Sequence, residues 1–120
     1  YSVGGAPTTI MAGLNCGSVC SLIWPIIWNY TDFYISGSDD MAVDGIRAYA
    51  FNEGEDLKII SGESGASTMG ALLGVLAEPS MEEMKKKMKI DENSVILLIN
   101  TEGDTNPENY RKIINGDWNN

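Results

Sequence analysis

The chain contains no histidine among its 120 residues. Histidine is the commonest general base and metal ligand near neutral pH, so no Ser-His-Asp or Cys-His nucleophile can be assembled from this chain. The two cysteines, Cys16 and Cys20, fall short of the four ligands of a structural zinc site. We expect them to be free thiols, with a disulfide between them left open. Any chemistry must therefore come from carboxylates, hydroxyls, lysines, the backbone or a cofactor.

Positive charge is also scarce, with 8 Lys and Arg against 17 Asp and Glu and a net charge of −9. This balance disfavours duplex nucleic acid and anionic membrane surfaces as partners, because both are bound through basic side chains. The apolar run at residues 94–100 is far shorter than the roughly 20 residues of a bilayer span, and no signal peptide is recognisable. We expect one cytoplasmic domain over residues 1–120, and the absence of an initial Met suggests a part of a longer protein.

Helical periodicity appears first at residues 21–31, where Pro25 interrupts an apolar face. A helix there either begins near Trp24 or bends at the proline. Ser38 is a candidate N-cap for a second helix, with two aspartates in its first turn. The apolar face of that helix is predicted to consist of Met41, Ala42, Ile46, Tyr49 and Ala50.

A third helix is predicted after residues 62–66, and Pro79 should end it. Its expected apolar stripe, at positions three and four apart, is Met69, Leu72, Leu73 and Leu76. Gly70 and Gly74 lie on another face and would permit close packing. Ser80 and Glu83 fit a capping box for a short fourth helix.

A last helix is predicted after residue 106, with Asn106 as its cap and Pro107 in the first position. Gly116 is suited to end it. Its apolar stripe is expected at Tyr110, Ile113 and Ile114.

Strands are predicted between these helices, at residues 8–11, 32–37, 58–61 and 94–100. The alternation predicts an α/β fold, a three-layer, mainly parallel sheet with flanking helices. Ligands of such sheets bind at the carboxyl ends of the strands. Two of these ends are polar and rich in glycine, residues 61–66 and 100–105, and a site is expected there.

Three segments, in order, resemble one known family: TIMAGLNCG (9–17), IISGESGA (59–66) and VILLINTEGDTNPENYRKI (95–113). They are similar to the carboxy-terminal third of the diaminopropionate ammonia-lyases, fold type II enzymes that use pyridoxal 5'-phosphate (PLP). Each motif alone is weak, but three in order at the family's spacing are strong. The resemblance covers nearly the whole chain and implies the C-terminal portion of a tryptophan synthase β-like PLP fold.

The resemblance implies that the intact protein is a carbon–nitrogen lyase that converts 2,3-diaminopropionate to pyruvate and ammonia by α,β-elimination. Such an enzyme needs a Schiff-base lysine and a phosphate-binding loop, and in this family both lie upstream of the matched region. The lysines present lie on amphipathic helices or head a strand, so we expect the chain to be inactive alone. The implied partners are the rest of the same polypeptide, a small amino-acid substrate and further copies in a homo-oligomer. A threonine or serine deaminase-type fragment and a non-enzymatic α/β binding module remain as alternatives.

The resemblance also implies which residues line the cofactor. Thr101 matches the hydroxyl residue that hydrogen-bonds the pyridine nitrogen of PLP, although an ordinary strand-end hydroxyl explains a threonine there as well. Glu63 matches an acidic position beside the cofactor, and Gly62 and Ser61 would line the same pocket. A carboxylate favoured by the helix dipole is the alternative for Glu63.

A fifth residue, Gly13, matches a loop near the active site of the family. Glu102 and Asp104 are interpreted as turn residues. The chain departs from the family pattern at residues 18–25, so no substrate contact is assigned there.

Overall fold

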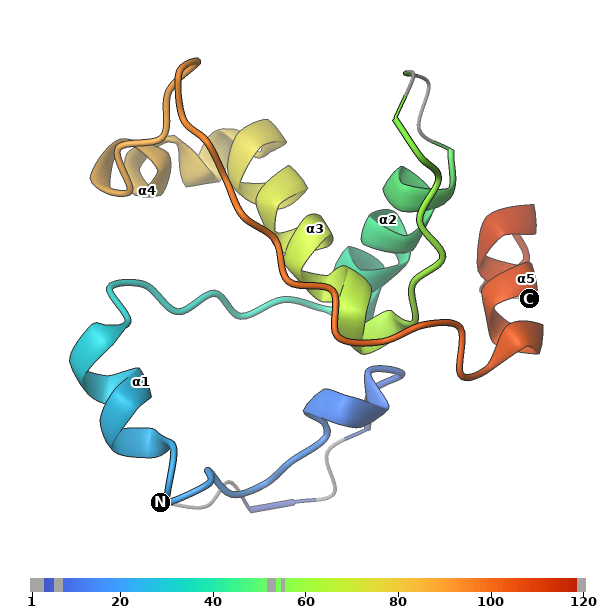
Figure 1. Cartoon of the computed structure of the whole chain (residues 1–120), viewed down its shortest axis with the longest axis horizontal. Helices are drawn as coiled ribbons and strands as arrows, with labels where there is room; N and C mark the ends of the chain where they lie inside the picture. The colour runs from blue at the N-terminus through green and yellow to red at the C-terminus, as the bar shows by residue number, and fades with distance from the viewer. Residues whose placement is uncertain (1–3, 6–7, 52–53, 55, 119–120) are drawn as a thin grey trace.

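The structure is a computed structural model, and it describes residues 4–5, 8–51, 54 and 56–118. Helices α2, α3 and α5 gather around one core, whereas α1 lies apart at the end of long connecting segments (Figure 1). The elements, in chain order, are η1 (Ala12–Leu14), α1 (Trp24–Tyr30), α2 (Asp39–Ala50), α3 (Glu63–Ala77), η2 (Pro79–Met81), α4 (Glu82–Lys87) and α5 (Pro107–Asn115).

The predicted α/β fold with a parallel sheet is wrong, because no strand occurs in the part of the chain that the structure describes. A strand exists only where a neighbouring strand supplies a ladder of backbone hydrogen bonds. The segments expected to be strands make isolated bonds instead, such as Ile59 N to Tyr49 O at 3.2 Å. The apolar run at residues 94–100, predicted to be a strand of the sheet, is mostly exposed, with Leu97 85% accessible.

The core lies where α2 crosses α3, with α5 packed beside them (Figure 1). Small residues let the two helices approach until their backbones touch. A Cβ atom on Gly45 would lie 2.9 Å from the Gly70 nitrogen, and one on Gly70 would overlap the carbonyl of Met41. The buried apolar cluster that closes this core consists of Val43, Ile46, Tyr49, Ala66 and Ile113.

Helix α3 ends before Pro79 as predicted, but it begins at Glu63, inside the segment 62–66 after which it was predicted to start, and its buried face is not the predicted one. Leu73 and Leu76 of the expected stripe are 37% and 42% exposed. The close approach of α2 requires small side chains, so the face with glycine, alanine and serine is the one that packs. Gly70 takes part in that close packing as expected, whereas Gly74 faces open space. The buried residues of α3 are Glu63, Ser64, Gly65, Ala66, Ser67, Gly70 and Val75.

The predicted ends of the first two helices are largely confirmed. Helix α1 begins at Trp24, with Pro25 in the first turn. Ser38 occupies the N-cap position of α2, but its side chain makes no capping hydrogen bond. The capping box predicted at Ser80 and Glu83 is wrong, because a 3-10 turn precedes α4 and Met81 occupies its N-cap position.

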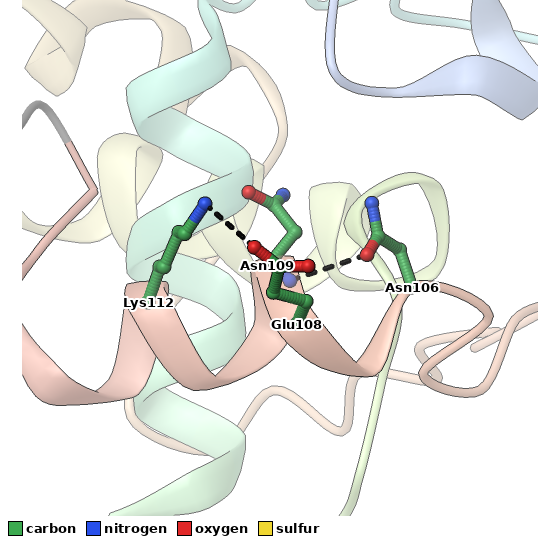
Figure 2. A network of polar contacts seen from close by, with 4 residues as sticks. All are labelled: Asn106, Glu108, Asn109 and Lys112. Atoms are coloured by element: carbon green, nitrogen blue, oxygen red, sulfur yellow. Dashed lines mark hydrogen bonds and ion pairs between the residues drawn. The ribbon is translucent and has the colours of Figure 1, made fainter.

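Helix α5 follows its sequence signals closely. Figure 2 shows its first turns, where the Asn106 side chain accepts a hydrogen bond of 3.2 Å from the Asn109 backbone nitrogen. Lys112 and Glu108, one turn apart, form an ion pair of 3.0 Å. Gly116 ends the helix in the left-handed conformation with φ 87°, which glycine adopts without steric cost.

Two polar contacts attach the outer segments to the core. The Arg47 Nε donates to the carbonyl of Ile113 at 3.1 Å, which joins α2 to the last turn of α5. The Asp39 carboxylate at the start of α2 accepts from the Thr9 hydroxyl and, at 3.3 Å, from the Ile10 nitrogen. This second contact joins the segment just before η1 to the start of α2.

Candidate functional site

The structure brings together the three segments in which site residues were predicted. The backbone nitrogen of Gly13 in η1 donates to the Ser64 hydroxyl at 3.0 Å. The Ser61 hydroxyl donates to the Asn100 side-chain oxygen, also at 3.0 Å. Helix α3 therefore begins at the point where η1 meets the loop of residues 100–105.

The start of α3 is capped from outside the helix. Its N-cap residue, Gly62, has no side chain with which to accept the free N–H groups of the first turn. The Glu102 carboxylate takes that role, because its Oε2 accepts from the Ser64 nitrogen at 2.9 Å. A carboxylate there is also favoured by the helix dipole. Glu102, interpreted as a turn residue from the sequence, is thus a helix cap supplied from 38 residues away.

Glycine is required where this loop crosses the helix start. A Cβ on Gly62 would lie 2.7 Å from the Cδ of Glu102, and one on Gly65 would lie 3.0 Å from the Glu102 nitrogen. Both distances are shorter than ordinary contacts with a Cβ. The glycines of the SGESGA motif therefore serve a backbone-to-backbone approach between the two predicted loops.

Glu63 is 7% exposed and is bound within the fold. The side-chain amide of Asn109 donates to its Oε1, which ties the first residue of α3 to α5. This contact gives Glu63 a structural role that the sequence did not indicate. Its place beside a cofactor stays a prediction.

Thr101 differs from its two neighbours. Asn100 and Glu102 are both hydrogen-bonded to the start of α3, whereas the Thr101 side chain is exposed and has no hydrogen-bond partner within the described ranges. Gly103, two residues further on, has nothing within 4 Å of the position that a Cβ would take. A neutral, exposed hydroxyl is thus present on an otherwise fixed loop.

Asp104, also interpreted as a turn residue, acts on α5. Burial, and after it the negative charge of Asp104, raise the pKa of Tyr110 above its ordinary value. Asp104 makes no hydrogen bond to α3 among the residues that the structure describes. It is therefore an acidic neighbour of Glu102 that has no part in capping the helix.

An apolar cavity of about 770 Å³ adjoins this site between η1 and α1. Its lining includes Gly13, Leu14 and Trp24, together with the two cysteines. Both cysteines are exposed and are not bonded to each other. No group of three or more cysteines and acidic residues could hold a metal ion, as far as the described residues go. In the same residues, no helix combines the length and the apolar character needed to cross a membrane.

Four residues at this junction were not named as site residues from the sequence, although the first three lie within the predicted segments 61–66 and 100–105: Ser64, Asn100, Glu102 and Asn109. The sequence holds one signal for Glu102, since a helix that starts after glycine lacks its own cap and requires an acceptor from elsewhere. The pairing of Asn109 with Glu63 spans 46 residues and has no local signature.

No protein-family model matches the chain. Diaminopropionate ammonia-lyase from Escherichia coli strain K12 is 41% identical over 113 residues, which cover 94% of the chain and 28% of the enzyme. The chain is homologous to diaminopropionate ammonia-lyase. The Salmonella typhimurium enzyme is 39% identical over 120 residues, covering 99% of the chain and 29% of that protein. The chain thus spans less than a third of the length of these relatives.

Solved structures of the Escherichia coli diaminopropionate ammonia-lyase have the same arrangement. The structure in complex with an aminoacrylate-PLP azomethine reaction intermediate matches with a TM-score of 0.83 and 40% identity, over 90% of this chain and 28% of that one. The complex with D-serine matches with a TM-score of 0.82 and 37% identity, over 89% and 28%. The apo form of the Escherichia coli enzyme matches less closely, with a TM-score of 0.73 over 78% of this chain and 26% of that one.

Proposed function

We propose that the chain is the carboxy-terminal part of a PLP-dependent carbon–nitrogen lyase that eliminates ammonia from 2,3-diaminopropionate. The observation that carries this proposal is the exposed, unbonded Thr101 hydroxyl on a loop fixed to the start of α3. The homology to diaminopropionate ammonia-lyase over 94% of the chain supports it. A cytoplasmic location and assembly as a homo-oligomer are part of the same proposal.

The residues at the junction fit one edge of PLP. When bound, PLP supplies an electron sink for elimination at the β carbon of an amino acid. The Thr101 hydroxyl is neutral and free, so it can donate a hydrogen bond to a pyridine nitrogen. Unlike a carboxylic acid, it would not protonate that nitrogen. Ser61, Gly62 and Glu63 are proposed to line the same pocket, because Ser61 bonds to Asn100 beside Thr101 and Gly62 and Glu63 begin the same helix; Gly13, which donates to Ser64, is proposed to line it from the side of η1.

The same residues do not fit the other end of the cofactor. None of the six lysines is buried. Lys87 and Lys112 are exposed and form ion pairs with Glu83 and Glu108 on the surfaces of their own helices. A lysine that forms a Schiff base needs a neutral amine, commonly obtained by desolvation. The chain is therefore proposed to be inactive alone, with the lysine and the phosphate-binding loop supplied by other parts of the protein.

Serine is the second candidate substrate, because the Escherichia coli relative has been solved in complex with D-serine. The two substrates differ in their leaving groups, ammonia from diaminopropionate and water from serine. Comparison of pyruvate formation from both by the protein that carries this chain separates the two candidates.

The experiment that tests the ring contact is the substitution Thr101→Val in the protein that carries this chain. Thr31→Val, at an exposed threonine after α1, is the matched control. We expect Thr101→Val to weaken PLP binding and to lower the rate of pyruvate formation about tenfold, as for loss of one hydrogen bond to the cofactor. Equal behaviour of the two variants would refute the contact.

A further inference from the structure

We infer that Glu102 is a positioning residue for Thr101, because it fixes the loop of residues 100–105 on the first turn of α3. The role of Thr101 in this inference rests on the proposed function. The fixation itself rests on hydrogen bonds of the chain's own residues, so the two parts can be tested separately.

Glu102 makes contacts with its backbone and with both carboxylate oxygens. Its carbonyl accepts from the Gly62 nitrogen at 3.1 Å. Its Oε2 accepts from the Ser64 nitrogen at 2.9 Å, and its Oε1 accepts from the Thr105 hydroxyl at 3.0 Å. One side chain therefore joins the helix start to the far end of its own loop.

Asn100 fixes the other side of Thr101. Its Oδ1 accepts from the Ser61 hydroxyl at 3.0 Å and from the Glu102 nitrogen at 3.2 Å. The neighbours of Thr101 are thus both held at the start of α3, Asn100 through its side chain and Glu102 through its carbonyl and carboxylate oxygens. The Thr101 side chain itself remains unbonded in the described part of the chain. This arrangement fixes the position of the Thr101 hydroxyl and leaves its hydrogen-bonding capacity unused. A group that binds an external partner requires both.

Glutamine and alanine separate hydrogen bonding from charge at this position. In Glu102→Gln, the amide oxygen can still accept from the Ser64 nitrogen, and the amide nitrogen can donate to the Thr105 hydroxyl. Glu102→Ala can make neither bond. Asp104→Ala is the matched control, because it removes an equal charge from the same loop at a residue that does not cap α3.

The first test is hydrogen–deuterium exchange in the protein that carries this chain, followed in peptides that cover residues 61–66 and 99–106. In Glu102→Ala, we expect both peptides to exchange about tenfold to a hundredfold faster, since hydrogen bonds to a charged group are lost. Glu102→Gln should remain within a few-fold of the wild type, and so should Asp104→Ala. Unchanged exchange in Glu102→Ala, or faster exchange in Asp104→Ala to the same degree, would overturn the inference.

The second test is the absorption spectrum of bound PLP in a double-mutant cycle. We expect Glu102→Ala to shift the cofactor band in the same direction as Thr101→Val, and the double variant to shift it no further than Thr101→Val alone. Additive shifts would show that Glu102 does not act through Thr101. A band that Thr101→Val leaves unchanged would refute the proposed ring contact and the positioning role with it, while faster exchange in Glu102→Ala would show that only the structural contact exists.

Discussion

Replacement of Gly70 with alanine should separate helices α2 and α3 and destabilise the core. The added Cβ would overlap the carbonyl oxygen of Met41 and lie 2.7 Å from its carbonyl carbon, whereas ordinary contact begins at 3.4 Å. The helices must therefore move apart by more than the roughly 0.7 Å that the carbon alone requires, because the oxygen is nearer still, and a backbone carbonyl cannot turn aside as a side chain can. Overpacking of this kind costs up to about 3 kcal/mol, and alanine regains about 1 kcal/mol over glycine in a helix. The expected net decrease in the free energy of unfolding is about 2 kcal/mol.

Gly74→Ala is the control for this prediction, one turn further along the same helix. Nothing lies within 4 Å of a Cβ at this position, so the substitution should stabilise the chain by about 0.5–1 kcal/mol. Urea unfolding of both variants, followed by the helical circular dichroism signal, measures the two changes. Opposite signs are expected. A Gly70→Ala variant as stable as Gly74→Ala would refute the described crossing of α2 and α3.

Three further outcomes are expected. Asn109→Ala should lower the free energy of unfolding by about 1–3 kcal/mol, because it leaves the buried carboxylate of Glu63 without its donor; an unchanged urea midpoint would contradict that contact. The pKa of Tyr110 is raised above 10.0 by burial and by the charge of Asp104. The stability that the neutral side chain contributes is therefore present below pH 10 and is lost as the pH rises through the raised pKa, and Tyr110→Phe should remove this loss. An ordinary midpoint for Tyr110 in a spectrophotometric titration would contradict the raised pKa. The isolated chain should self-associate through its exposed apolar segments. Val95→Lys, at a fully exposed position, should reduce this self-association in sedimentation velocity while changing the unfolding free energy by less than about 0.5 kcal/mol. A wild-type chain that stays monomeric at high concentration would exclude the self-association.

Helix ends were the most predictable feature of this chain. The signals at Pro25, Asn106 and Gly116 act within a few residues, and each lies where its helix begins or ends. The capping box predicted at residues 80–83 was wrong, because residues 79–81 form a 3-10 turn and Met81 takes the N-cap position of α4. The buried face of α3 also failed, since hydrophobicity marks the leucines while the closeness of α2 selects the glycines.

The strands failed for a different reason. Residues 94–100 have a strong preference for extended backbone, but a preference becomes a strand only when a partner edge lies alongside. None does so in the described part of the chain, and the apolar side chains of this run remain largely exposed.

The sequence predicted where the site lies, but not the contacts that hold it together. Residues 61–66 and 100–105 do meet, although the reasoning that placed them together was a shared sheet edge that the structure lacks. What joins them is a Glu102 cap and two glycines that permit close approach.

The sequence by itself determined the helices, the exclusion of histidine chemistry and the resemblance to diaminopropionate ammonia-lyase, because these depend on residue identity or on interactions within one helical turn. Only the tertiary structure decided that Glu102 caps α3, that Asn109 binds Glu63 and that Thr101 is left free. Each of these depends on atoms 38 or 46 residues apart, or on the absence of a partner, and the distance between such atoms is set by packing of the whole chain.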